Sequence, residues 1–254
     1  MTAPPVVDAA GVRRVEHVMG MPISLALRGR HTDDEAADAA WAAVLASLRE
    51  ADRVFSTYRA DSVISGIRRG DLALAAAPDE VHEVLAIGAR AARATDGAFS
   101  VWRPDLDPSG VVKGWAVERA STFLRALPET DFCLSAGGDM VCRSVSGQPW
   151  RVGIEDPHDP ARVLAVVPVR DGAVATSGSA HRGEHLVDAR TGAAPAAVAQ
   201  VTVTAASLTW ADVDATAAYV LGARAAEWLG RRVGRAGLVV WAGGTTTTVP
   251  GEPA

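Results

Sequence analysis

The order of the periodic segments is the feature that most constrains what this chain can fold into. Apolar residues repeat at helical spacing over residues 33–54 and again from Pro78, and a third helix is expected from Lys113 to about Leu127. Strand-like runs dominate after that point, which favours an α+β fold over a regular alternation of strands and helices. The remaining expected elements are a short helix at 61–69, a helix at 209–230, and strands at 12–29 (interrupted at Gly20 and Pro22), 132–134, 140–144, 150–154, 163–169, 174–176, 201–205 and 237–241.

Length and charge narrow the class of protein. The chain has 254 residues, of which 48% are hydrophobic, enough for one domain, expected over residues 12–244 with a disordered lead at 1–11 and a flexible tail at 245–254. A net charge of −5 excludes the basic surface that nucleic-acid binding needs. The absence of an export signal and of a long apolar run, together with only two cysteines, predicts a soluble cytoplasmic protein.

The segment Asp107–Gly114 ends a loop rich in proline, aspartate and glycine and opens a helix. A helix N-terminus presents free backbone N–H groups and the positive end of the helix dipole, which suits a phosphate group. Gly110 would let the backbone approach a ligand, and Lys113 would bring a positive charge to a phosphate. An Asx-type turn that caps an ordinary helix would need the same residues, so the spacing leaves both interpretations open.

Asp212 and Thr216 stand four residues apart on a predicted helix, so their oxygen atoms lie on one face, whereas Asp214 points elsewhere. A carboxylate and a hydroxyl one turn apart are hard ligands of the kind that Mg²⁺ prefers, with water and substrate phosphates completing its shell. A structural explanation is also open. An aspartate in a first helical turn is favoured by the dipole, and a threonine can bond back to a carbonyl.

Residues 176–192 are dense in groups that accept, donate or carry protons. The imidazole of His185 titrates near neutral pH, and Asp188 follows at a spacing from which it could orient the ring, as a general base requires. The alternative is a polar surface hairpin that turns at Thr191-Gly192.

The common short catalytic signatures are absent. The sequence has no nucleotide-binding glycine motif, no nucleophile elbow and no Cys/His spacing typical of zinc. Two weaker features remain. Tyr58 could stack on a planar ring, and the pair Gly137-Gly138 marks either close approach to a ligand or a hairpin turn.

Taken in order, these motifs resemble those of the ApbE family of flavin transferases over roughly residues 17–222. The most specific pieces are the run His185-Leu-Val-Asp188-Ala-Arg-Thr-Gly192 and the helix segment Ala211-Asp212 to Ala215-Thr216. The resemblance implies an α+β fold made of one domain, with mixed or antiparallel sheets flanked by helices.

The resemblance also implies a substrate, a metal and site residues. FAD is expected to bind through its pyrophosphate, with Mg²⁺ held by the main-chain carbonyl of Gly110 and the side chains of Asp212 and Thr216. His185 matches the position of the base, and Asp188 and Lys113 join it as expected catalytic residues. The expected flavin contacts are Met19, Tyr58, Ala98, Phe99, Ser100, Asp107, Lys113, Gly137, Gly138, Ser177 and Leu186.

The reaction implied by the family moves FMN from FAD to a Ser or Thr hydroxyl of a target flavoprotein and releases AMP. Three alternatives stay open. One is a magnesium-dependent FAD pyrophosphatase, in which water replaces the protein hydroxyl. Another is a non-catalytic FAD-binding or delivery protein, which would need neither Asp212 nor His185. The third is a hydrolase that uses Ser177 or Ser179 with His185. The expected partners are FAD and the acceptor flavoprotein, with no nucleic acid and no membrane.

Overall fold

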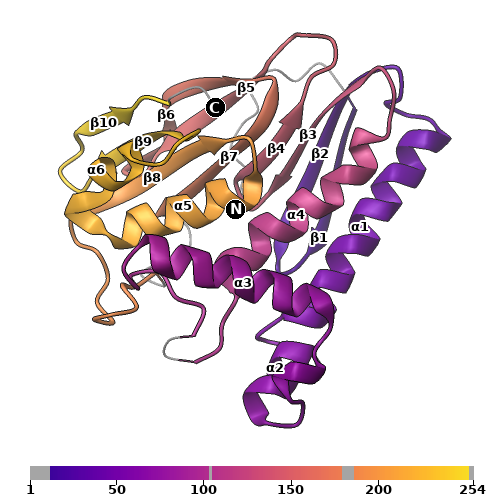
Figure 1. Ribbon diagram of the computed structural model, residues 1–254. Helices are drawn as coiled ribbons and strands as arrows, with labels where there is room; N and C mark the ends of the chain where they lie inside the picture. Colours follow the sequence, from indigo (N-terminus) through magenta and orange to yellow (C-terminus); the bar gives the residue numbers. More distant parts are fainter. Residues whose placement is uncertain (1–11, 103–104, 179–185, 252–254) are drawn as a thin grey trace.

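A computed structural model describes residues 12–102, 105–178 and 186–251 (Figure 1). Its centre is an antiparallel sheet in which most strands are neighbours in both sequence and space. In spatial order the strands are β1 (Val12–Val18), β2 (Met21–Gly29), β3 (Thr130–Ala136), β4 (Asp139–Arg143), β7 (Asp171–Gly178), β8 (Val198–Ala205), β9 (Ala236–Trp241) and β10 (Thr246–Val249).

Helices cover one face of this sheet. On that face α1 (Glu35–Phe55) packs beside α4 (Ser109–Arg125), α4 packs beside α5 (Leu208–Val220), and α5 lies over β7 and β8. Helix α3 (Asp79–Ala94) crosses the ends of α4 and α5 (Figure 1). A second, two-stranded sheet is formed by β5 (Trp150–Asp156) and β6 (Asp159–Val169). Further helices are α2 (Val63–Arg69) and α6 (Ala225–Gly230), with short 3-10 turns at Leu74–Ala76 and Gly222–Arg224.

Alternation along the central strands separates two cores. On β3, Phe132 and Leu134 face the helices and join the larger core, whereas Cys133 lies in a smaller core with Trp150 of β5. Because strands β3, β4 and β7 are buried on both faces, a polar residue on them must find a partner inside the protein. Val141 belongs to the helix-side core. Because alternate residues of a strand point to the same face, the odd-numbered residues of β4, Asp139 among them, face the helices as Val141 does.

The predicted α+β class with antiparallel sheets is confirmed, and so are the helices expected at 33–54, 61–69 and from Pro78. Helix α4 begins at Ser109, four residues before the expected start, which places Gly110 inside its first turn. None of the helices in the described ranges combines the length and apolar character that crossing a bilayer requires.

Three expectations about the ends of elements are wrong. The single helix expected at 209–230 is interrupted after Val220, where Gly222 adopts a φ of 59° that a right-handed helix cannot accommodate. Pro22 does not interrupt its strand but lies inside β2, paired with His17. The tail expected to be flexible from residue 245 contributes β10, which pairs with β9.

Candidate functional site

Lys113 places its ammonium between two buried carboxylates. Its Nζ is 2.5 Å from Asp139 Oδ2 and 3.2 Å from Asp212 Oδ1, and the two carboxylate side chains are only 1% and 3% exposed. Asp139 Oδ1 also accepts the backbone N–H of Thr176 at 3.0 Å. These contacts join α4, β4, β7 and α5 at one point. We refer to Lys113, Asp139 and Asp212 as the Lys113 cluster.

The glycine pair before Asp139 explains how this residue reaches the cluster. Gly137 and Gly138 have φ values of 56° and 101°, and they form the tight connection between β3 and β4. Positive φ at both central residues is typical of the hairpin turns that match the twist of antiparallel strands. Gly137 N–H donates to the carbonyl of Pro22 at 3.2 Å, so the turn also packs against β2. Of the two interpretations of this pair, the structure displays the hairpin turn.

Thr216 lies one turn beyond Asp212 on α5 and continues the polar face. Its Oγ1 is 3.0 Å from Ser177 Oγ, near the end of β7, and both residues are buried. Asp214, two residues from Asp212, faces away and binds Arg232 and Arg235 instead. Four residues expected at the site, Lys113, Ser177, Asp212 and Thr216, are therefore gathered on neighbouring elements.

Gly114 brings α4 and α5 into backbone contact beside Asp212. A Cβ atom at Gly114 would lie 2.9 Å from the Leu208 carbonyl oxygen and 3.0 Å from Asp212 Cβ. The Gly114 N–H donates to Asp212 Oδ2 at 3.1 Å, whereas in a regular helix this amide serves the carbonyl of Gly110. The Gly114 amide thus lies next to both the Gly110 carbonyl and the Asp212 carboxylate, the two groups expected to bind metal.

The charges of the cluster favour a cation. Burial raises the pKa of Asp212 to about 7; the attraction of Lys113 opposes this shift, and the nearby carboxylate of Asp139 adds to it. Within residues 12–102, 105–178 and 186–251, no three His, Cys, Asp or Glu side chains gather to hold a metal on their own. The expected ligands, one carboxylate, one hydroxyl and one carbonyl, are all hard oxygen donors. They fit Mg²⁺, which takes water and phosphate oxygens for the rest of its shell.

The loop before α4 lies against the same end of that helix. Ala98 and Phe99 are buried, and a Cβ atom at Gly110 would meet the Phe99 ring at 3.2 Å. The Ala98 carbonyl accepts the N–H of Ala189 at 2.9 Å, which ties this loop to the segment after β7. Asp107 Oδ1 accepts the N–H of Ser109, two residues on, at 2.9 Å, which forms an Asx-type turn that leads into α4.

The other expected flavin contacts lie farther out or have local partners. Tyr58 is 99% exposed between α1 and α2, and the Trp102 N–H donates to Ser100 Oγ. Met19 and Leu186 are partly buried against the helix-side core. Met19 sits in the turn between β1 and β2 with a positive φ of 56°.

His185 lies outside the residues that the structure describes, whereas Asp188 lies within them. The Asp188 carboxylate accepts from Arg190 Nε at 2.9 Å, and this hydrogen bond is the main cause of the lowered pKa of Asp188. The N–H groups of Thr191 and Gly192 both donate to the Asp188 carbonyl, which forms the expected turn. The described partner of the Asp188 carboxylate is thus Arg190.

The sequence predictions give no role to Asp139 or Glu118, although both contact the elements of the site. Signals for both were present. Asp139 directly follows the glycine pair, and Glu118 is the one acidic residue in the sequence of α4. A lone carboxylate on a largely buried helix needs a partner, which is a reason to look for one.

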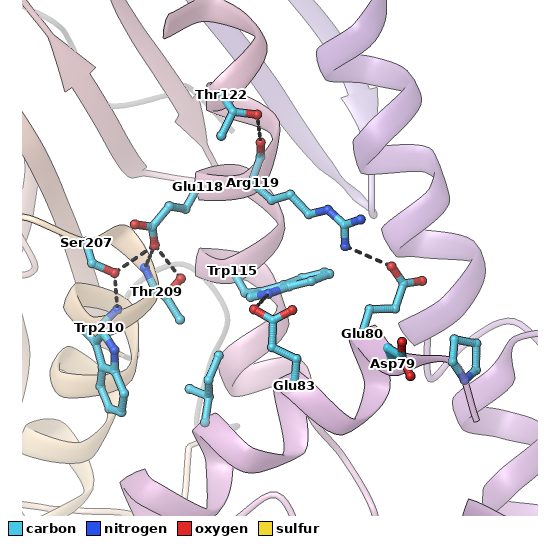
Figure 2. A pocket seen from close by; sticks show the side chains of 12 residues that line it. Asp79, Glu80, Glu83, Trp115, Glu118, Arg119, Thr122, Ser207, Thr209 and Trp210 are labelled. Carbon is cyan, nitrogen blue, oxygen red and sulfur yellow. Dashed lines mark hydrogen bonds and ion pairs between the residues drawn. The ribbon is translucent and has the colours of Figure 1, made fainter. Parts of the chain in front are cut away.

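A cleft of about 830 Å³ opens between α3, α4 and the start of α5 (Figure 2). Trp115 and Trp210 line it together with several carboxylates. Two of these carboxylates are held by contacts inside the cleft: Glu83 accepts from Trp115 Nε1 at 3.0 Å, and Glu80 pairs with Arg119 at 2.9 Å. No residue expected at the flavin or metal site lines this cleft among the described part of the chain. Its bonds hold the helices together, whereas the Lys113 cluster concentrates the groups suited to a phosphate and a cation.

Comparison with known proteins gives relatives of one kind. The chain is 33% identical over 147 residues to the FAD:protein FMN transferase of Salmonella typhimurium, covering 52% of this chain and 42% of that protein. It is 31% identical over 129 residues to the FAD:protein FMN transferase of Vibrio cholerae, covering 46% of this chain and 39% of that protein. Each match spans less than half of the relative's own length.

Solved structures share the fold over nearly the whole chain. The ApbE protein from Thermotoga maritima superposes with a TM-score of 0.82 at 21% identity, covering 93% of this chain and 96% of that one. The flavin transferase ApbE from Vibrio cholerae gives a TM-score of 0.80 at 21% identity, with the same coverage. A family model described as "ApbE family" matches residues 19–104 and 102–238. The chain therefore belongs to the ApbE family.

Proposed function

We propose that this protein is a magnesium-dependent FAD:protein FMN transferase, which moves FMN from FAD to a Ser or Thr hydroxyl of an acceptor flavoprotein. The observation that carries the proposal is the Lys113 cluster, placed beside Thr216 at the start of α4 in a chain of the ApbE family. The names of the relatives support the same activity. The residues of the candidate site and the names of the relatives therefore support the same activity.

The group transfer balances as follows. The acceptor hydroxyl oxygen attacks the phosphorus atom on the FMN side of the pyrophosphate, and a new P–O ester bond forms. The bond between that phosphorus and the bridging oxygen breaks, and AMP leaves with the bridging oxygen. The hydroxyl proton passes to a base, for which we propose His185. No oxidant or reductant is needed, because the flavin keeps its redox state.

The chain's own residues would bind and neutralise the pyrophosphate. Lys113, the fifth residue of α4, carries a positive charge near the start of this helix, where the positive end of the helix dipole also favours an anion. Gly110, Asp212 and Thr216 would hold Mg²⁺. The bound ion would neutralise charge on the phosphates during displacement. We assign Tyr58 to the isoalloxazine ring, which suits its planar and exposed side chain.

Incubation of the purified protein with FAD, with and without Mg²⁺, tests the proposal when a flavin-free cell extract supplies acceptor proteins. Released AMP is quantified by chromatography, and covalent flavin is detected as fluorescent bands after denaturing electrophoresis. Fluorescent bands with matching AMP, both dependent on Mg²⁺, are expected. Release of AMP and free FMN without a fluorescent band would show that the activity is that of a pyrophosphatase and not of a transferase. If FAD binds but no AMP is released under any condition, the protein is a flavin carrier and not a transferase.

Replacement of His185 by alanine is expected to lower covalent FMN transfer by at least about 10²-fold, since a general base contributes roughly 10²- to 10⁴-fold. The FAD dissociation constant should stay within about threefold of the wild-type value, because a base does not carry ground-state binding. Flavin fluorescence on denaturing gels measures transfer, and fluorescence titration measures FAD binding. His158→Ala, at an exposed turn between β5 and β6, is the matched control. Wild-type transfer by the His185 variant would remove this assignment.

A further inference from the structure

Glu118 reaches from α4 to the start of α5 (Figure 2). Its Oε2 accepts hydrogen bonds from Ser207 Oγ at 2.8 Å, from the Thr209 N–H at 2.9 Å and from Thr209 Oγ1 at 2.5 Å. Thr209 is the second residue of α5, and its N–H is one of the amides that a helix cannot satisfy internally. The carboxylate also stands at the positive end of the α5 dipole. Glu118 therefore caps the Thr209 amide from a neighbouring helix.

Ser207 and Glu118 divide the capping of α5 between them. Ser207 is the N-cap residue, and its Oγ accepts the N–H of Trp210 at 3.4 Å while it donates to Glu118. The first amides of α5 are thus held partly by a residue of the same segment and partly by a residue of α4. Because one of the two caps comes from another helix, the start of α5 has a defined position relative to α4.

A second attachment lies one turn earlier on α4. Gly114 and Glu118 are four residues apart, so both face α5. The Gly114 N–H binds Asp212 Oδ2 at 3.1 Å, and a Cβ atom at Gly114 would be 3.0 Å from Thr209 Cα. With the backbones in contact at this point, α5 can change its position along α4 only if both attachments break.

We propose that Glu118 is a positioning residue for the metal site. It fixes α5 along α4, so that Asp212 and Thr216 stay opposite Lys113 and Gly110. It acts through α5 and does not belong to the Lys113 cluster. The inference rests on the proposed function, because it takes Asp212 and Thr216 as the side chains that hold Mg²⁺. Both side chains belong to one helix, so a small displacement of that helix moves both ligands at once.

Three variants test this role: Glu118→Ala, Glu118→Gln and the control Glu83→Gln. The glutamine at position 118 keeps an oxygen acceptor but loses the charge, and it also serves if the alanine variant does not fold. Glu83 lines the same cleft from α3, and its Oε1 accepts from Trp115 Nε1, so it contacts α4 but not the start of α5. The control therefore makes the same chemical change in the same cleft.

Two measurements are needed for each variant. Mn²⁺ binding to the purified protein with FAD, followed by electron paramagnetic resonance, reports metal affinity without turnover. AMP release in the presence of the flavin-free extract, over a range of Mg²⁺ concentrations, separates the Mg²⁺ requirement from the maximal rate. For Glu118→Ala we expect both the Mn²⁺ dissociation constant and the half-maximal Mg²⁺ concentration to rise about tenfold or more, the range found when residues behind metal ligands are removed. The maximal rate should recover at saturating Mg²⁺.

Glu118→Gln should show a smaller rise in both constants, and Glu83→Gln should stay within about twofold of the wild type. Wild-type Mn²⁺ and Mg²⁺ constants in both Glu118 variants would overturn the inference, even if their melting temperatures fall, because that pattern belongs to a purely structural cap. A wild-type protein that releases no AMP with FAD, Mg²⁺ and the flavin-free extract that supplies acceptor proteins would overturn the proposed function itself. The two failures are therefore distinguishable.

Discussion

Alanine in place of Asp212 is expected to lower magnesium-dependent AMP release from FAD by at least about 10³-fold. The carboxylate is the one charged group among the proposed Mg²⁺ ligands, and neutralisation of phosphate charge by a metal is worth several kcal/mol, where each 1.36 kcal/mol is about tenfold in rate. Asp212 is 2% exposed and accepts the Gly114 N–H at 3.1 Å, so its carboxylate is held in one position that alanine does not reproduce. FAD should still bind, because the flavin contacts lie on other elements.

The variant should remain folded, which separates this result from a trivial loss of structure. Burial raises the pKa of Asp212 to about 7, a sign that its ionised form is held in an unfavourable environment. Removal of this buried charge therefore offsets part of the stability that the variant loses with the hydrogen bond from Gly114. AMP is followed by chromatography, and folding by circular dichroism. Asp79→Ala, at an exposed position in the first turn of α3, is the control. A folded Asp212→Ala protein with more than a tenth of wild-type AMP release would contradict the metal assignment.

At Asp214, two residues from Asp212, substitution is expected to lower stability and not activity. Asp214→Ala should lower the free energy of unfolding by about 3–5 kcal/mol, the range for breaking a buried ion pair. Asp214 is 1% exposed, and its two oxygens accept from Arg232 Nη2 at 2.9 Å and from Arg235 Nε at 2.7 Å. The two arginines are 26% and 16% exposed, so the change leaves two poorly solvated cations without their partner.

Equilibrium unfolding in urea measures this loss, with Glu227→Ala as the control. Glu227 pairs with Arg231 on the surface of the protein, where an ion pair contributes less than about 1 kcal/mol. Specific activity per folded molecule should change little in Asp214→Ala when assayed well below its unfolding transition. A destabilisation below about 1 kcal/mol would show that α5 is held by its apolar contacts rather than by this ion pair.

The fold was predictable where local patterns are strong. The apolar repeat that includes Val44 and Leu48 fixes α1, and the seven-residue helix ending at Arg69 has a serine cap and a terminal glycine. The break at Gly222 was missed, although glycine is the residue most common just past a helix end. Leu221 before it and Ala223 to Ala226 after it are mostly good helix formers, so the pattern continues across the glycine. The pairing of β10 was missed for a similar reason. Four threonines in a row carry no alternation that would distinguish an edge strand from a loop.

For the candidate site, the sequence indicated individual site residues but not the side chains that contact them. The spacing of Asp212 and Thr216 places both on one side of α5, near Lys113 and Ser177. The position of Asp139 beside Lys113 depends on a turn of two glycines and on the parity of β4, and it becomes visible only when the sheet is assembled. The bond between Glu118 and Thr209 is of the same kind, because it joins two helices that the intervening strands separate along the chain.

The neighbouring strands β2 and β3 have a consequence for the folding kinetics of this protein. They pair from Ile23↔Ala136 to Gly29↔Thr130, although helices α1 to α4 lie between them in the sequence. The entropy of closing a loop of roughly 100 residues costs about 3 kcal/mol more than that of closing a two-residue turn such as the one between β3 and β4. Among the described residues, the strands from β3 onward have no such long insertion of helices before their next partner, apart from α5 and α6 between β8 and β9. The β1–β2 hairpin is therefore expected to dock late, and its amides should gain protection in pulsed hydrogen exchange after those of β3 and β4.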